Sequence, residues 1–136
     1  MPAVLVDSNV LLDVTTQDPV WGEWSISTLE RIGGESNLVK NALVYAEASV
    51  GFSSVEELEK AQPAEFYRRE DLPYEAAFLA GKVFAEYRRR GGSRRSPLPD
   101  FYIGAQALLA GYRLLTRDAR RFSTYFPDLE LIAPAR

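Results

Sequence analysis

The chain has neither cysteine nor histidine among its 136 residues. The absence of cysteine excludes disulfide bonds and thiolate metal sites. The absence of histidine removes the side chain whose ordinary pKa lies closest to neutral pH, and with it the usual proton shuttle of enzymes. Any catalysis must therefore rest on carboxylates, hydroxyls, lysine or a metal ion held by oxygen ligands.

Long apolar runs are also missing. No apolar stretch approaches the roughly 20 residues that span a bilayer. The first residues lack the basic start and long apolar segment of a secretory leader. We therefore expect a cytoplasmic protein with no membrane contact. A length of 136 residues with 46% hydrophobic side chains predicts one globular domain, residues 1–136, around a single core.

Charge is unevenly distributed along the chain. The formal net charge is −3, yet five of the 16 basic residues fall between positions 88 and 95. Such a cluster is typical of the solvated end of a long helix, where positive charge suits the helix dipole. It is equally typical of a surface that binds phosphates. The candidates for phosphate binding are Arg88, Arg89, Arg94 and Arg95.

Strand-like and helix-like segments alternate along the sequence. Apolar runs at 3–6, 37–40, 113–116 and 129–132 are typical of buried strands, and 65–68 is a weaker candidate. Caps, prolines and glycine stops mark helices after Asp7, over 21–32, from Asn41 to Gly51, from Ser54 to near Pro63, from Pro73 to Tyr87, from Asp100 to Gly111 and after Asp118. This alternation predicts a three-layer α/β/α fold with a mainly parallel sheet.

Four acidic residues, which we call the acidic quartet, fall where parallel α/β proteins place ligand-binding groups. Asp7 and Asp118 each follow a strand-like run, Asp100 opens a helix after a proline-rich loop, and Glu47 lies within a helix. Each aspartate could simply cap a helix, which contributes ~0.5–2 kcal/mol. Glu47 is harder to explain, because apolar residues four positions before and three after it predict a carboxylate on an apolar stripe.

If the quartet converges, its charge must be neutralised. Two carboxylates ~4 Å apart repel by roughly 4 kcal/mol at an effective dielectric of 20, so some would stay protonated or a metal would bind. Oxygen ligands alone favour Mg²⁺ or Mn²⁺, which could activate a water for phosphodiester hydrolysis.

Several polar residues near the quartet are candidates to orient carboxylates or ligand waters. These are Ser8, Asn9, Asn41 and Thr116. Local helix capping explains Ser8 and Asn41 at least as well. Asp13, nearly two helical turns after Asp7, is expected on the solvated surface.

Four blocks of sequence occur in order across nearly the whole chain. They are Val4-Leu-Val-Asp7-Ser-Asn-Val-Leu-Leu-Asp13, Asn41-Ala-Leu-Val-Tyr-Ala-Glu47, Pro99-Asp100-Phe-Tyr-Ile-Gly104-Ala and Leu114-Leu-Thr-Arg-Asp118. Together they resemble the PIN-domain family, specifically the VapC-type toxin ribonucleases of toxin–antitoxin pairs. The resemblance implies a five-stranded parallel sheet, Mg²⁺- or Mn²⁺-dependent endoribonuclease activity, a homodimer, and inhibition by a cognate VapB-type antitoxin.

The resemblance also assigns roles to residues. It implies that the acidic quartet holds the metal and is catalytic, with the Thr116 hydroxyl beside it. The arginines at 88–95 are RNA-binding candidates on other grounds, because the cluster lies just upstream of Asp100. One residue departs from the pattern, because Gln106 stands where we expect histidine in many relatives. That change puts any auxiliary proton transfer or RNA contact at this position in doubt.

Two other functions fit the same carboxylates. An aspartate-based phosphatase or phosphoacceptor domain also places aspartates at parallel-strand ends, but the aspartyl-nucleophile kind has Asp-x-Asp after its first strand, where this chain has Asp7-Ser8-Asn9. A non-catalytic module could instead hold a basic peptide in an acidic groove. Neutralising the quartet would then weaken that binding without abolishing any hydrolysis.

Overall fold

A five-stranded parallel sheet forms the centre of the computed structural model, which describes residues 2–95 and 98–135. The strands are β1 (Val4–Val6), β2 (Leu38–Lys40), β3 (Arg68–Arg69), β4 (Arg113–Leu115) and β5 (Leu131–Ile132). Their order is β3-β2-β1-β4-β5, and every neighbouring pair is parallel. The α/β architecture with a five-stranded parallel sheet is thus confirmed, and β1 lies in the middle of the sheet.

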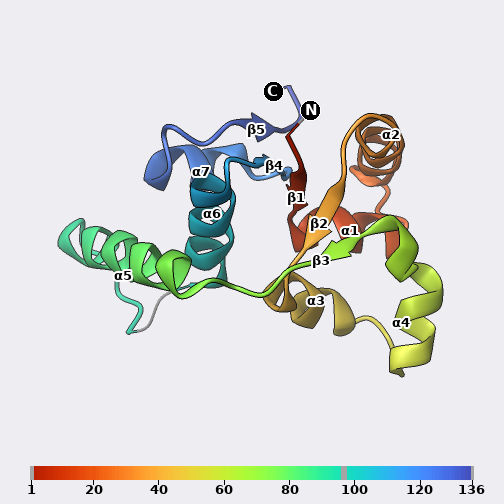
Figure 1. Cartoon of the computed structure of the whole chain (residues 1–136), viewed down its shortest axis with the longest axis horizontal. Helices are drawn as coiled ribbons and strands as arrows, with labels where there is room; N and C mark the ends of the chain where they lie inside the picture. The colour runs from red at the N-terminus through yellow and green to blue at the C-terminus, as the bar shows by residue number, and fades with distance from the viewer. Residues whose placement is uncertain (1, 96–97, 136) are drawn as a thin grey trace.

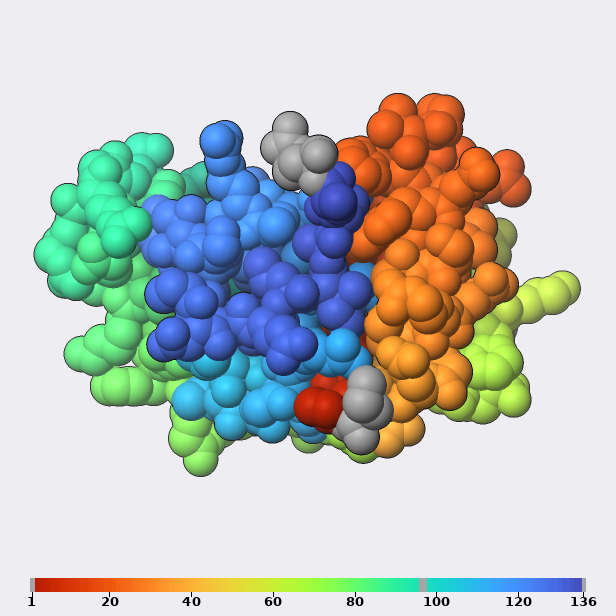
Figure 2. Space-filling view, turned by 90° about the horizontal axis from the view of Figure 1, so that it is seen from above, coloured from red at the N-terminus to blue at the C-terminus, as the bar shows by residue number. Residues whose placement is uncertain are grey.

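Helices connect the strands and cover the sheet. They are α1 (Ser8–Thr15), α2 (Gly22–Gly33), α3 (Ala42–Ser49), α4 (Val55–Ala61), the short 3₁₀ turn η1 (Ala64–Phe66), α5 (Tyr74–Arg89), α6 (Pro99–Ala110) and α7 (Ala119–Tyr125). Figure 1 shows α5, α6 and α7 on one side of the strands and α1 and α2 on the other. In the space-filling view, the C-terminal part of the chain lies between α2 and α5 (Figure 2).

Local sequence signals set most helix ends. The Asn41 side chain accepts a hydrogen bond from the Val44 N–H at 2.9 Å and so caps α3, as expected. The Ser54 hydroxyl accepts one from the Glu57 N–H at 3.1 Å at the start of α4. Gly111 ends α6 in the left-handed conformation, with φ of 74°.

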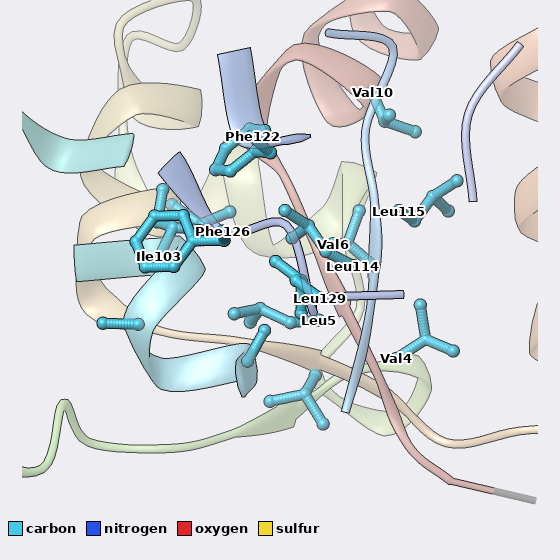
Figure 3. Close-up of a cluster of buried hydrophobic side chains, with 14 of the residues drawn as sticks. Val4, Leu5, Val6, Val10, Ile103, Leu114, Leu115, Phe122, Phe126 and Leu129 are labelled. Carbon is cyan, nitrogen blue, oxygen red and sulfur yellow. The ribbon is translucent and has the colours of Figure 1, made fainter. Parts of the chain in front are cut away.

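The core packs against both faces of the sheet. The alternation of side chains along β1 and β4 places Leu5 and Leu114 toward Ile103 on α6 and Phe126 just after α7, with Val4 on the opposite side (Figure 3). All of these side chains are buried. Close packing also explains Gly104 in α6, since a Cβ there would lie 2.4 Å from the Phe126 ring.

Two local expectations about secondary structure and helix faces are wrong. The run at 65–68 is mostly the turn η1, and β3 covers only Arg68–Arg69. In α3 the buried face consists of Val44 and Ala48, whereas Val50 is 85% exposed, so Glu47 does not lie on a buried apolar stripe. Helical periodicity fixes the angles between side chains, but it does not determine which face of a short helix meets the core.

Asp13 is also placed differently from the expectation, since it is 2% exposed rather than solvated. It accepts hydrogen bonds from Arg117 Nε at 2.7 Å and Nη2 at 3.0 Å. The Ser25 hydroxyl on α2 donates a further one at 2.9 Å. This buried carboxylate therefore joins α1 to α2 and to the segment after β4. Its arginine partner lies 104 positions along the chain, beyond the reach of any local pattern.

Candidate active site

The parallel pairing of β1 with β4 brings two members of the quartet to the same edge of the sheet. Val6 pairs with Leu115, so the residues that follow these strands are neighbours. The Asp7 N–H donates to the Leu115 carbonyl at 2.9 Å, and the Thr116 hydroxyl donates to Asp7 Oδ2 at 2.8 Å. Thr116 also accepts from the Asp118 N–H at 3.0 Å, and thereby links the two aspartate positions.

Helices α3 and α6 carry the other two members of the quartet, Glu47 and Asp100. Helix α1 begins directly after Asp7, and the Ser8 hydroxyl donates to Glu47 Oε1 on α3 at 2.8 Å. Asp100 lies in the first turn of α6. A pocket of about 270 Å³ lies among these elements. It is lined by Asp7, Ser8, Asn9, Glu47, Arg94, Leu98, Pro99, Asp100, Asp118 and Arg121. All four members of the acidic quartet therefore line one pocket.

Asp7 is the most perturbed acid of the pocket. Its side chain is 4% exposed, and burial raises the pKa of its carboxyl from 3.8 to about 7. The nearby carboxylates of Asp100 and Glu47 contribute to this raised pKa, while the hydrogen bonds from Thr116 and the Ser8 backbone oppose it. Negative charge is therefore incompletely compensated where Asp7 lies.

Arg121 supplies part of the missing positive charge. Its Nη1 donates to Asp100 Oδ2, and its Nε lies 3.5 Å from Asp118 Oδ2. Arg121 is not among the residues that the sequence motifs indicate, although its position three residues after Asp118 on α7 is a spacing at which helical side chains meet.

The oxygen-only donor set of the pocket fits a hard divalent cation in kind. In the arrangement seen over residues 2–95 and 98–135, however, no three acidic side chains are grouped closely enough to hold one ion together. The guanidinium of Arg121 bonds instead to two of the four carboxylates.

The polar residues expected around the quartet divide into two groups. Ser8 and Thr116 contact quartet carboxylates directly, and Asn9 Nδ2 lies 3.4 Å from the Thr116 hydroxyl. Asn41 does not line the pocket, and its Nδ2 donates to Gln106 Oε1 at 2.7 Å. Asn41 therefore acts on the site only through the start of α3, the helix that carries Glu47.

Gln106, at the position where histidine is expected in many relatives, forms two side-chain hydrogen bonds. It is buried in α6, accepts from Asn41 and donates through Nε2 to the Asp71 carbonyl at 3.1 Å. The amide thus accepts and donates at once, joining α3 to the loop that follows β3. It does not line the pocket of the acidic quartet.

One of the four arginine candidates reaches the pocket. Arg94 lines it, and the Arg94 carbonyl accepts a hydrogen bond from Arg88 Nη1 at 2.6 Å. Arg89 bonds to Glu86 at 2.7 Å on the exposed end of α5. Segment 88–95 therefore includes both a solvated helix end and a positive group beside the carboxylates.

Comparison with known proteins identifies the family. The family model of the PIN domain matches residues 4–126. The chain belongs to the PIN-domain family. No curated protein sequence matches the chain.

Several solved structures of toxin–antitoxin and VapBC proteins share the fold. VapBC2 from Rickettsia felis, bound to a DNA fragment from its promoter, aligns with a TM-score of 0.75 at 17% identity, over 98% of this chain and 99% of that one. VapBC-1 from nontypeable Haemophilus influenzae gives 0.72 at 18% identity, over 96% and 97%. A toxin–antitoxin complex from Klebsiella pneumoniae gives 0.69 at 20% identity, over 98% and 99%. At these identities the similarity shows a common fold.

A further structural fact concerns membranes. Within the described part of the chain, no helix combines the length and the apolar character needed to cross a bilayer.

Proposed function

We propose that this PIN domain is an Mg²⁺- or Mn²⁺-dependent endoribonuclease and the toxin of a VapBC-type toxin–antitoxin pair. The observation that carries the proposal is the convergence of Asp7, Glu47, Asp100 and Asp118, from four separate segments, on one pocket at the carboxyl edge of the parallel sheet. Helix capping alone requires no such convergence, because each cap acts on its own helix.

The residues of the pocket have distinct roles in this proposal. The acidic quartet would hold the cation, Ser8 would orient Glu47, and Thr116 would orient Asp7. When bound, a divalent cation lowers the pKa of water and offsets the charge that develops on a phosphodiester. The quartet would position that cation, and the hydroxyl donors would keep the carboxylate oxygens turned into the pocket.

The substrate and partners follow from charge and from fold. Arg94 places a positive side chain beside the carboxylates, where it can contact an RNA phosphate. The similar solved structures include VapBC complexes and a toxin–antitoxin complex, which supports a VapB-type antitoxin as the protein partner. The homodimer is carried over from the family resemblance.

The test is cleavage of a mixed RNA substrate by the purified chain. We expect cleavage with Mg²⁺ or Mn²⁺ and none with chelator, and a loss of most activity in Glu47→Gln. Glu56→Gln is the matched control, because Glu56 lies exposed on α4 and away from the pocket. RNA binding that weakens in Glu47→Gln, with no cleavage by any form of the protein, would favour a non-catalytic acidic-groove module.

The ends of the products test the chemistry. Attack by the neighbouring 2′-hydroxyl commonly relies on histidine pairs and leaves cyclic phosphates, and the chain has no histidine. Hydrolysis by water should leave a 5′-phosphate and a 3′-hydroxyl, which mass spectrometry identifies. A 2′,3′-cyclic phosphate formed in chelator would contradict both the acidic site and the hydrolytic mechanism.

A further inference from the structure

Arg121 on α7 connects two members of the acidic quartet that come from different elements. Its guanidinium bonds to Asp100 in the first turn of α6 and lies 3.5 Å from Asp118, the N-cap of α7. The Arg121 backbone N–H also lies 3.4 Å from Asp118 Oδ1. The side chain is 53% exposed, so the guanidinium can move into solvent without opening the core.

A divalent cation in this pocket would bind the same carboxylate oxygens of Asp100 and Asp118 with which the Arg121 guanidinium pairs. Asp100 and Asp118 are proposed metal ligands, and the present inference rests on that proposed function. The two positive groups also repel each other across the small pocket. In the structure the Arg121 guanidinium forms ion pairs with Asp100 and Asp118. No three acidic side chains of the described residues form a common metal site.

We infer that Arg121 is an internal competitor of the divalent cation. Its guanidinium neutralises Asp100 and Asp118 in the metal-free protein and withdraws from Asp100 when the cation binds. Arg121 is thus a positioning residue that sets the metal concentration at which the site is filled. Each ion pair of such exposure changes an equilibrium constant by about one- to fivefold. Loss of both ion pairs and of the like-charge repulsion should therefore tighten cation binding about three- to tenfold.

Direct Mn²⁺ binding to the whole chain tests the inference, measured by titration calorimetry and by the electron paramagnetic resonance signal of free Mn²⁺. Arg121→Gln should bind Mn²⁺ about three- to tenfold more tightly than the wild type. Arg120→Gln is the matched control, because it removes the same charge from the same helix and Arg120 forms none of the ion pairs found among the described residues. Arg121→Lys should be intermediate, since lysine keeps the charge but lacks a planar fork that spans two carboxylates.

Thermal unfolding gives a readout that a merely structural arginine would not reproduce. In chelator, Arg121→Gln should melt below the wild type, because Asp100 and Asp118 lose their counter-charge. At saturating Mn²⁺ the difference should vanish, because the cation has replaced the guanidinium in both proteins. A structural role would lower the melting temperature equally under both conditions.

The outcomes separate this inference from the proposed function. If wild type and Arg121→Gln bind Mn²⁺ with equal affinity, the metal site stands and the competition is refuted. If Arg120→Gln tightens binding as much as Arg121→Gln, net charge is the cause and the competition is again refuted. If no form of the protein binds Mn²⁺, both the competition and the proposed metal-dependent function are overturned.

Discussion

Replacing Asp7 by asparagine should stabilise the metal-free protein at neutral and alkaline pH. Burial, with Asp100 and Glu47 nearby, raises the pKa of Asp7 from 3.8 to about 7. Above pH 7 the folded protein therefore carries a buried carboxylate whose charged form is better solvated in the unfolded chain. Asparagine has nearly the same shape and no charge, so it removes this cost.

The pH dependence of the effect has a definite sign. The unfolded chain releases the Asp7 proton near pH 4 and the folded protein near pH 7, so the folded state binds more protons between these values. The stability of the wild type must then fall as pH rises from about 4 to about 7, and the Asp7 contribution must level off above that range. In the asparagine variant this contribution is absent at every pH.

The size of the effect follows from the same shift. A pKa raised by about three pH units corresponds to about 4 kcal/mol of lost stability above pH 7. The amide cannot accept the Thr116 hydroxyl at the second oxygen position, which costs about 1–2 kcal/mol. We therefore expect Asp7→Asn to be more stable than the wild type by about 2–3 kcal/mol at pH 8, which raises the melting temperature by about 7–10 °C.

Urea unfolding in chelator from pH 5 to pH 8.5 measures this difference. Asp128→Asn is the matched control, because it removes one carboxylate from the exposed loop before β5. The stability gain of Asp7→Asn should grow with pH up to about 7 and then stay constant. A variant no more stable than the wild type at pH 8, or a gain that does not change between pH 5 and 8, would refute the reasoning.

Further predictions concern binding and packing. Neutralising the four arginine candidates of segment 88–95 together should weaken RNA binding and flatten its salt dependence; an unaltered salt slope would assign them to the solvated helix end. Asp13→Asn should destabilise the fold by about 1–3 kcal/mol in urea titrations, because the partly exposed Arg117 loses the buried carboxylate with which it pairs; an unchanged midpoint would contradict a role in joining α1 and α2. Gly104→Ala should cost about 1–3 kcal/mol, since its Cβ would meet the Phe126 ring, and adding Phe126→Leu should recover part of that loss, whereas no recovery would place the strain elsewhere.

The alternation of elements and the helix starts could be predicted from the sequence because both are local properties. Asn41 and Ser54 cap the helices that their positions indicate, and Gly111 ends α6. Strand-like runs with intervening helices allow few topologies other than a parallel α/β sheet, and the sheet is of that kind. The strand expected at 65–68 lies instead at Arg68–Arg69, because a short edge strand has little apolar periodicity to mark it.

Two members of the candidate site, Asp7 and Asp118, could also be named from the sequence, because carboxylates that follow parallel strands lie at one edge of the sheet. The sequence also indicates Asp100, which opens a helix after a proline-rich loop, and Glu47, whose carboxylate is expected among apolar residues. Their environments could not be named in advance. The sequence predicts Glu47 on an apolar stripe, yet its side chain is half-buried and accepts a hydrogen bond from the Ser8 hydroxyl. Asp13 was expected in solvent, yet it is buried against Arg117.

The sequence by itself thus determined the parallel α/β fold, the caps and the four carboxylates, since each depends on residues a few positions apart or on strand order. Only the tertiary structure decided which groups neutralise those carboxylates. Arg121 meets Asp100 across 21 positions, and Thr116 meets Asp7 across 109. Such pairings depend on how helices pack on the sheet, and long-range packing leaves no periodic trace in the chain. The raised pKa of Asp7 has the same origin, because burial is a property of the assembled core.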